Sequence, residues 1–280
     1  MVSPVNEQPI GIFDSGVGGL TILQAVRKRM PGERLVYLAD SAGFPYGGRS
    51  AADIQARTAA SCRALLDGGC KLIVIACNTA TVAALVHLRA RFPEVPFVGV
   101  VPVVKPLAER TRTGMVAVLA TPGTAASDYL AGLVARFARG TRVLSIGCPG
   151  LADLVEEGIV AGPRVDEALA APLAAVRRSG ADLVGLGCTH YPFLRPALAR
   201  QLGDAIGILD SAEPVARRVE AILAERGAST APEGPGAWRF LATAQPERFR
   251  AVASTLLGKP LPPVEPVSPS VMAGTLVDAD

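Results

Sequence analysis

Short runs of apolar, β-prone residues alternate with longer helical patterns along most of this 280-residue chain. This rhythm is typical of βαβ units, in which helices cover both faces of a parallel sheet. The runs are apolar nearly throughout, as strands buried on two sides require. The predicted strands are residues 10–13, 34–39, 72–76, 96–100, 115–120, 142–146, 182–186, 206–209 and 238–242. The predicted helices are residues 18–30, 50–67, 79–91, 123–138, 163–178, 193–202, 212–226 and 246–257.

The length and a weak internal correspondence favour two similar α/β halves. A chain of this length is comfortable for two domains of about 100–150 residues each. "IFDSGVGGLTIL" is echoed by "VLATPGTAASDYL", and "VIACNTAT" by "GLGCTHYP", at nearly equal offsets. Chance similarity of strand–loop–helix junctions is the alternative. The segment 99–113 is predicted to connect the halves, 227–236 to be a loop, and the tail from Lys259 to be poorly ordered.

Composition excludes several classes of protein. Half of the residues are apolar, and the formal charge of +3 is too small to indicate a nucleic-acid partner. The five cysteines form no CxxC pair, so reduced thiols are expected rather than disulfides or a metal site. No apolar stretch approaches the 18–20 or so residues of a membrane span, and no signal peptide precedes the first strand. These features predict a soluble cytoplasmic protein with no membrane partner.

Two cysteines follow apolar runs at the predicted ends of strands. Cys77 lies in "LIVIACNTAT" and Cys188 in "LGCTHYP", and each is expected to begin a helix. Ligands of open parallel sheets bind beyond the carboxyl ends of the strands, and a helix N-terminus lowers a thiol pKa from about 8.5 toward neutrality. Asn78, Thr79 and Thr189 add capping oxygens and backbone N–H groups that could hold a carboxylate. One such cysteine is ordinarily a packing residue, but two in matching positions favour chemistry.

The first strand ends in "FDSGVGGL", which resembles a dinucleotide-binding loop only in part. Thr21 stands where the last glycine of GxGxxG belongs, so an NAD site is weakly supported. The purely structural interpretation of this loop is a tight turn with a helix cap. The functional one assigns Asp14 as a carboxylate reaching the reacting centre and Ser15 as an anion ligand.

Two further segments supply candidate residues for the same pocket. Pro45, Tyr46 and Gly47 form a rigid turn after the second strand. Of the two histidines, His87 lies inside a helical pattern, whereas His190 stands two residues after Cys188. An imidazole in that position could polarise the thiol or donate a proton.

A pair of thiols suggests proton transfer at a carbon acid. One base removes a proton from one face while an acid returns a proton to the other, which inverts the stereocentre. Pyridoxal phosphate would need a Schiff-base lysine. None of the four lysines, at positions 28, 71, 105 and 259, lies in a convincing strand-end loop. The sequence therefore favours a reaction without a cofactor and without a metal.

Taken in order, "IGIFDSGVGGLTIL", "ADSAGFPYGGRS", "LIVIACNTAT" and "LGCTHYPFL" closely resemble the glutamate racemase family, within the aspartate/glutamate racemase superfamily. "GVVPVVKP", "GCPGLADLVEEG" and "FLATAQPERF" extend the resemblance over residues 9–265. It implies cofactor-independent interconversion of L- and D-glutamate, which supplies D-glutamate for bacterial peptidoglycan. It also implies two α/β domains with pseudo-twofold symmetry, an active site in the cleft between them, and a homodimer. The expected domains are 1–98 with 209–262, and 99–208, followed by a flexible tail, 263–280.

The resemblance also implies the role of each site residue. Cys77 would deprotonate D-glutamate and Cys188 L-glutamate, with Asp14, His190 and Glu156 as their acid–base neighbours; Glu157 is a less favoured match than Glu156. The substrate contacts implied are Asp14, Ser15, Pro45, Tyr46, Gly47, Cys77, Asn78, Thr79, Thr121, Cys188, Thr189 and His190.

Three other functions stay open at this point. A racemase for aspartate, a hydantoin or another small acid would share the two-thiol layout. A protein-binding role, such as inhibition of a DNA enzyme, is weakened by the near-neutral charge. A thiol redox function is disfavoured because the cysteines lack CxxC spacing.

Overall fold

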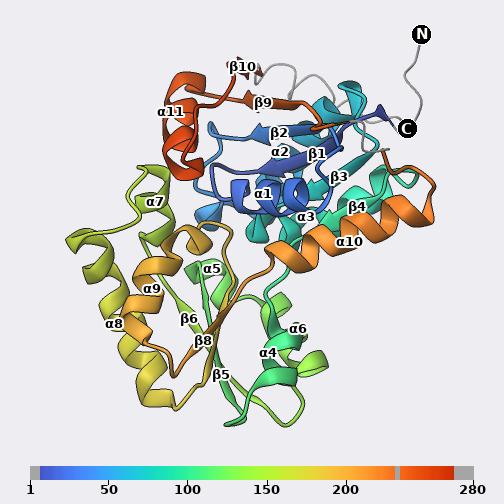
Figure 1. Cartoon of the computed structure of the whole chain (residues 1–280). Coiled ribbons are helices and arrows are strands. Elements are labelled where there is room, and N and C mark those ends of the chain that lie inside the picture. Colours follow the sequence, from blue (N-terminus) through green and yellow to red (C-terminus); the bar gives the residue numbers. More distant parts are fainter. Residues whose placement is uncertain (1–6, 231–233, 268–280) are drawn as a thin grey trace. The chain divides into compact units, whose positions relative to one another are not determined.

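The computed structural model describes residues 7–230 and 234–267 of the chain. Its internal contacts divide the chain into two units (Figure 1). The first unit combines Met1–Val100 with Ala212–Asp280, and the second is the continuous segment Val101–Ser211. The first and last residues of the second unit are in contact, because Ser211 Oγ donates a hydrogen bond of 2.7 Å to the carbonyl of Val101.

The first unit is built on a six-stranded parallel sheet of order β10-β9-β2-β1-β3-β4. Its strands are β1 (Ile10–Asp14), β2 (Leu35–Ala39), β3 (Leu72–Ile75), β4 (Phe97–Gly99), β9 (Trp238–Ala242) and β10 (Val264–Pro266). Its helices are α1 (Leu20–Arg29), α2 (Ala51–Asp67), α3 (Asn78–Arg91), α10 (Ala212–Glu225) and α11 (Pro246–Leu257), with a 3₁₀ turn, η2 (Tyr46–Gly48).

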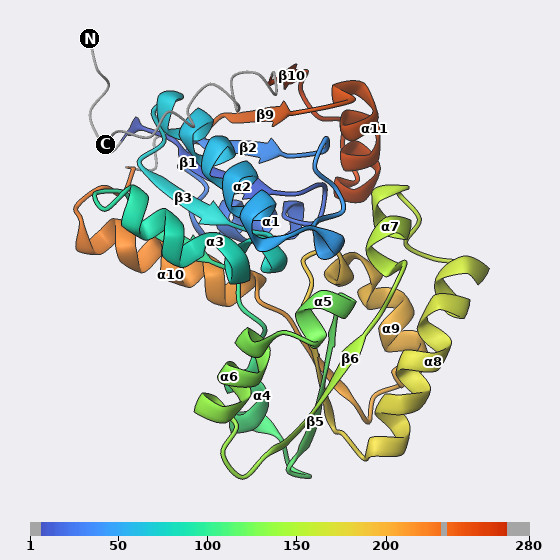
Figure 2. The ribbon, with the colours of Figure 1, turned by 180° about the vertical axis from the view of Figure 1, so that it is seen from behind.

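Both faces of this sheet are covered, which explains why its strands are apolar throughout. Phe13 and Ile75 point into a buried cluster with residues of α2 and α3, the two helices that lie in front of the strands in Figure 2. Helices α1 and α10 lie over the opposite face (Figure 1). There Tyr37 of β2 stacks on Phe249 of α11, with ring centroids 5.8 Å apart.

The second unit contains a four-stranded parallel sheet of order β6-β5-β7-β8. Its strands are β5 (Met115–Ala120), β6 (Arg142–Gly147), β7 (Leu183–Leu186) and β8 (Gly207–Leu209). Its helices are α4 (Val104–Arg110), α5 (Pro122–Ala125), α6 (Asp128–Phe137), α7 (Leu151–Glu156), α8 (Pro163–Ser179) and α9 (Arg195–Leu202), with a 3₁₀ turn, η3 (Tyr191–Leu194). Val104 and Leu107 of α4 pack with Val116 and Val118 of β5 in its core.

The two sheets repeat one strand order, since β2-β1-β3-β4 corresponds to β6-β5-β7-β8. The paired sequence motifs lie at corresponding places in this order. Asp14 ends β1 and Thr121 follows β5, while Cys77 and Cys188 are each the second residue after β3 and β7. The shared topology accounts for the repeated motifs and brings each set to the carboxyl edge of its own sheet.

Each predicted strand is confirmed, with ends that differ by at most one residue. The expectation of a poorly ordered tail from Lys259 is wrong over Val264–Pro266, which pairs with β9 as an added edge strand. Val264 is buried there opposite Phe240. Residues 268–280 of the expected tail lie outside the described residues.

Three helical features differ from the prediction. The segment 99–113, expected to be a connection, contains α4, and Pro106 is tolerated because it lies in the first turn, where N–H groups lack helical partners. The helix α7 was not predicted. The predicted helix 123–138 is two helices, because Ser127 starts α6 anew by capping the N–H of Leu130. Within the described ranges, no helix combines the length and apolarity needed to span a membrane.

Candidate active site

Three candidate residues of the first unit meet at the carboxyl ends of β1 and β3. Asp14 is fully buried, and Ser15 and Cys77 are nearly so. Ser15 Oγ lies 3.5 Å from Asp14 Oδ1 and 3.6 Å from Cys77 Sγ. A hydroxyl carries one proton, so Ser15 can donate to the carboxylate or to the sulfur, and it links the two groups.

Cys77 occupies the N-cap position of α3. Its Sγ accepts a hydrogen bond of 3.5 Å from the backbone N–H of Ala80. The positive end of the helix dipole at this point favours negative charge on the sulfur. Beside it, Asn78 is buried, and its Nδ2 has no hydrogen-bond partner in the described part of the chain. A buried amide donor without an acceptor is rare in folded proteins, and this one belongs to the residue that follows Cys77.

The glycines after Asp14 serve helix packing rather than a dinucleotide. A Cβ on Gly19 would lie 2.8 Å from Asp14 Cβ, 2.9 Å from Ala76 Cβ and 2.9 Å from the Tyr37 hydroxyl. Only glycine therefore allows α1 to begin this close to the strands. The Tyr37 hydroxyl donates to the Gly16 carbonyl at 2.7 Å, and the Gly16 N–H donates to Asp14 Oδ1 at 2.8 Å. These bonds fix the loop that carries the carboxylate.

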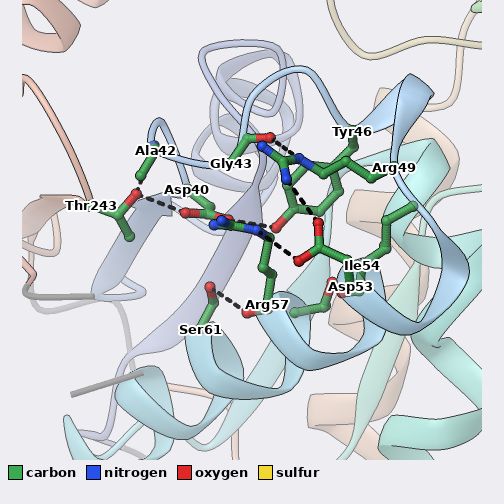
Figure 3. A network of polar contacts seen from close by, with 11 residues as sticks. Asp40, Ala42, Gly43, Tyr46, Arg49, Asp53, Ile54, Arg57, Ser61 and Thr243 are labelled. Carbon is green, nitrogen blue, oxygen red and sulfur yellow. Dashed lines mark hydrogen bonds and ion pairs between the residues drawn. The ribbon is translucent and has the colours of Figure 1, made fainter. Parts of the chain in front are cut away.

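A buried carboxylate organises the turn that contains Tyr46 (Figure 3). Asp40, directly after β2, is fully buried and accepts 2.7 Å hydrogen bonds from the hydroxyls of Tyr46 and Thr243. Arg57 of α2 adds an ion pair of 3.2 Å to the same carboxylate. Burial and the negative charge of Asp40 raise the pKa of Tyr46 well above its usual range, so the hydroxyl keeps its proton and donates it.

The same turn exposes the other two predicted contact residues. Pro45 and Gly47 are exposed on either side of the buried Tyr46. Arg49, at the C-terminal end of the turn, stabilises it, because its side chain donates hydrogen bonds to the Gly43 carbonyl at 2.6 Å and to Asp53 of α2 at 2.8 Å (Figure 3). The backbone of this turn is thus held in place while two of its residues remain available to a ligand.

The second unit brings Cys188, His190 and Glu156 into one chain of contacts. Cys188 Sγ lies 3.6 Å from His190 Nδ1, and His190 Nε2 lies 2.7 Å from Glu156 Oε1. Burial alone would lower the pKa of His190, but its contacts with Cys188 and Glu156 outweigh burial and raise that pKa well above 6.5. Glu157 instead pairs with Arg164 at 2.8 Å. The structure thus brings Glu156, and not its neighbour, to the imidazole.

Cys188 differs from Cys77 in its backbone setting. The expectation that both thiols stand at helix N-termini is wrong for Cys188, which lies in a turn before η3, where His190 is the N-cap residue. The polar contact of this sulfur is therefore with the imidazole rather than with a helix N-terminus. Thr189 is buried beside it, and Thr121 caps α5, with its Oγ1 accepting from the N–H of Thr124 at 3.4 Å.

The remaining three cysteines are dominated by burial. All five thiols are free. Burial raises the pKa of Cys62 above its usual range and raises those of Cys70 and Cys148 to about 12. These three thiols therefore stay protonated at neutral pH and act as packing residues.

Sequence reasoning missed the residues that hold the Tyr46 turn, namely Asp40, Arg57 and Thr243. For Asp40 a signal existed, because an acidic residue directly after an apolar strand lies at the ligand-binding edge of a parallel sheet. Thr243 follows β9 in the same way. Arg57 lies in the interior of α2, and nothing in its local sequence distinguishes it from a surface arginine.

Comparisons with known proteins find relatives over most of the chain. The family described as Asp/Glu/Hydantoin racemase matches residues 20–219. A glutamate racemase of Roseiflexus sp. is 48% identical over 249 residues, which cover 89% of this chain and 92% of that protein. A solved glutamate racemase from Bacillus anthracis superposes with a TM-score of 0.84 at 30% identity, covering 94% of this chain and 98% of that one. The Escherichia coli glutamate racemase, solved with L-glutamate, has a TM-score of 0.82 at 32% identity, covering 93% and 98%.

Proposed function

The chain belongs to the Asp/Glu/Hydantoin racemase family, and from this premise we propose that it interconverts L- and D-glutamate without a cofactor. One observation carries the proposal. Cys77 and Cys188 occupy the same position after corresponding strands, and each has a polar partner suited to proton transfer. In the bacterial cell this reaction would supply D-glutamate for peptidoglycan.

In the proposed mechanism one sulfur acts as a thiolate base and the other as a thiol acid. For D-glutamate, the Cys77 thiolate takes the α-proton and the Cys188 thiol delivers a proton to the opposite face of the carbon. For L-glutamate the two roles are exchanged. Asp14 and Ser15 adjust protonation at Cys77, while His190 and Glu156 do so at Cys188.

The transition state carries extra negative charge on the α-carboxylate. Hydrogen-bond donors that are already in position stabilise this charge. Asn78 Nδ2, which has no partner in the described part of the chain, and the N-terminal N–H groups of α3 are candidate donors that directly follow Cys77 in the sequence. The other proposed substrate contacts are Ser15, Pro45, Tyr46, Gly47, Thr79, Thr121 and Thr189. Glutamate is proposed as the substrate because the curated relatives and solved structures above are glutamate racemases.

Exchange of the α-proton in deuterium oxide tests the role of each thiol. The wild type should exchange and invert both enantiomers. Cys77→Ala should lower racemisation by about 100-fold or more and abolish exchange of D-glutamate, because the base for that face is gone. Exchange of L-glutamate without inversion should persist through Cys188. Cys188→Ala should show the reverse pattern, and proton NMR measures both quantities.

Cys70→Ala is the matched control, since it removes a buried thiol of the first unit whose pKa of about 12 keeps it protonated. Its exchange rates should match the wild type. Normal racemisation by Cys77→Ala would overturn the mechanism. A chiral panel of glutamate, aspartate and hydantoins, followed by circular dichroism, tests the substrate, and preference for another member would overturn that assignment.

We also propose that the enzyme is a cytoplasmic homodimer with no nucleic-acid or membrane partner. Support comes from the family resemblance, the small net charge and the described helices, none of which could span a membrane. Light scattering of the purified enzyme tests the dimer, and a monomeric mass at working concentration would contradict it.

A further inference from the structure

A hollow of about 490 Å³ lies in the first unit, and the proposed reaction makes no use of it. Its lining residues are Gln24, Arg27, Lys28, Gly236, Trp238 and Lys259. They come from the last turns of α1, the start of β9 and the segment after α11. We call this hollow the Trp238 pocket.

The Trp238 pocket lies at the amino edge of the sheet, opposite the edge that carries Asp14 and Cys77. Trp238 is the first residue of β9 and pairs with Leu35, the first residue of β2. The strands are parallel and five residues long here, so the two edges are separated by roughly 13 Å along the strands. A ligand in this pocket would not occupy the proposed substrate site.

Among the described residues, the lining has three cationic side chains and no carboxylate. Lys259 Nζ lies 3.8 Å from the centroid of the Trp238 ring, and Arg27 Cζ lies 5.5 Å from it. Basic residues at the end of α1 are expected, because they favour the negative end of the helix dipole. That reason does not apply to Lys259, which comes from a different element and adds a third like charge.

Two polar features suit this pocket to an anion with several oxygens. Arg27 is fixed by its hydrogen bond of 2.7 Å to the Gly236 carbonyl, so its guanidinium is already in place. The indole Nε1–H of Trp238 is buried and has no acceptor among the described residues. An oxyanion would neutralise the converging charges and would offer the indole N–H an acceptor.

We propose that the Trp238 pocket binds a small phosphate-class oxyanion, either inorganic or as the phosphate group of an organic molecule. A single carboxylate would offer two oxygens to donors that arrive from three directions. A phosphate offers three or four oxygens and up to two negative charges, and lysine and arginine are its usual partners.

The protein provides its own reporter, because Trp238 is the only tryptophan in the chain. Inorganic pyrophosphate is titrated into the wild-type enzyme while tryptophan fluorescence is recorded. A saturable change is expected, because the ligand alters the cations that contact the ring. Sodium chloride at matched ionic strength should give no saturable change, and inorganic phosphate and an organic monophosphate distinguish the two sources of the ligand.

Lys28→Gln and Lys259→Gln should each weaken pyrophosphate binding by about fivefold or more, since each removes one charge-assisted contact. Lys259→Arg should largely restore the affinity. Lys105→Gln is the matched control, because it removes an exposed lysine of the second unit that pairs with Glu109. The midpoint of the titration is compared, rather than the intensity, because Lys259 itself affects the indole.

Saturating D-glutamate should leave the pyrophosphate midpoint unchanged, which separates this pocket from the proposed catalytic site. The proposal is overturned if chloride reproduces the signal, if both lysine variants bind as the wild type does, or if glutamate competes with pyrophosphate. Each of these results is independent of whether the enzyme racemises glutamate.

Discussion

Among single residues, His190 most directly connects the structure to the pH dependence of the protein. Its imidazole is buried between a thiol and a carboxylate, and its pKa in the folded state lies well above 6.5. Since the folded pKa exceeds the unfolded one, protonation of His190 stabilises the fold below pH 6.5 or so. That contribution is lost as the pH rises through the folded pKa, on the alkaline side of the usual histidine range.

Substitution of Glu156 by Gln should lower the pKa of His190, because a neutral amide no longer favours the imidazolium. Proton NMR can follow this titration in a His87→Gln background, where His190 is the only histidine left. A midpoint at or below 6.5 in the protein with Glu156 intact would contradict the arrangement described here. An unchanged midpoint after the substitution would show that Glu156 does not act on the ring.

The sequence predicts those site residues that can be recognised from their immediate neighbours in the chain. Cys77 and Cys188 stand out because each follows an apolar run and precedes polar capping residues. The Asp40 network could not be predicted as a network, since Tyr46, Arg57 and Thr243 reach Asp40 from three separate elements. Only the folded chain shows that these side chains share one carboxylate.

Among the elements, the turn at η2 depends on one buried hydroxyl. Tyr46→Phe removes the hydrogen bond to Asp40, and we expect a loss of about 1.5–3 kcal/mol in the free energy of unfolding, because the acceptor is charged. The exposed Pro45 and Gly47 would lose their fixed position. The KM for glutamate should therefore rise more than kcat falls, as measured by steady-state kinetics together with urea unfolding.

Thr58→Val provides the comparison for this variant. It removes another buried hydroxyl, one that donates within α2 to the Ile54 carbonyl at 2.6 Å. Its KM should equal that of the wild type even where stability falls. An equal rise in KM for both variants would mean that Tyr46 acts through general destabilisation and not by positioning the turn.

The elements that the sequence failed to predict are short. The strand β10 spans Val264–Pro266 in a proline-rich segment, and it forms because it can pair with the free edge of β9. The helices α4 and α7 contain seven and six residues, too few for a clear helical period. Longer elements carry their pattern in the sequence, whereas these depend on the surfaces against which they pack.

For the molecule as a whole, the first unit must join two distant pieces of chain. One buried cluster helps to do so. Lys71 and Glu33, both almost completely buried, form an ion pair of 2.7 Å. Lys71 also donates to the Ala228 carbonyl at 2.8 Å, and Glu33 accepts from the N–H of Thr230 at 2.8 Å. These contacts connect the segment before residue 100 with the segment after residue 212.

Lys71→Met should therefore lower the free energy of unfolding by about 3–5 kcal/mol, because it leaves the carboxylate of Glu33 buried without its cation. The double variant Glu33→Gln with Lys71→Met should cost less than the sum of the two single changes. Urea unfolding of all three measures this. Lys105→Met, at an exposed pair, should change stability by no more than about 0.5 kcal/mol, and strict additivity at positions 33 and 71 would rule out the coupling.

The continuity of the second unit affects the order in which the protein can fold during synthesis. Residues 101–211 form a continuous segment whose first and last residues are joined by the Ser211–Val101 hydrogen bond. The ribosome releases this segment before β9 and β10, which the first sheet requires next to β2. Domains generally fold as units during synthesis. Residues 101–211 can therefore reach their native structure before β9 and β10 have been synthesised and have completed the sheet that contains β1–β4.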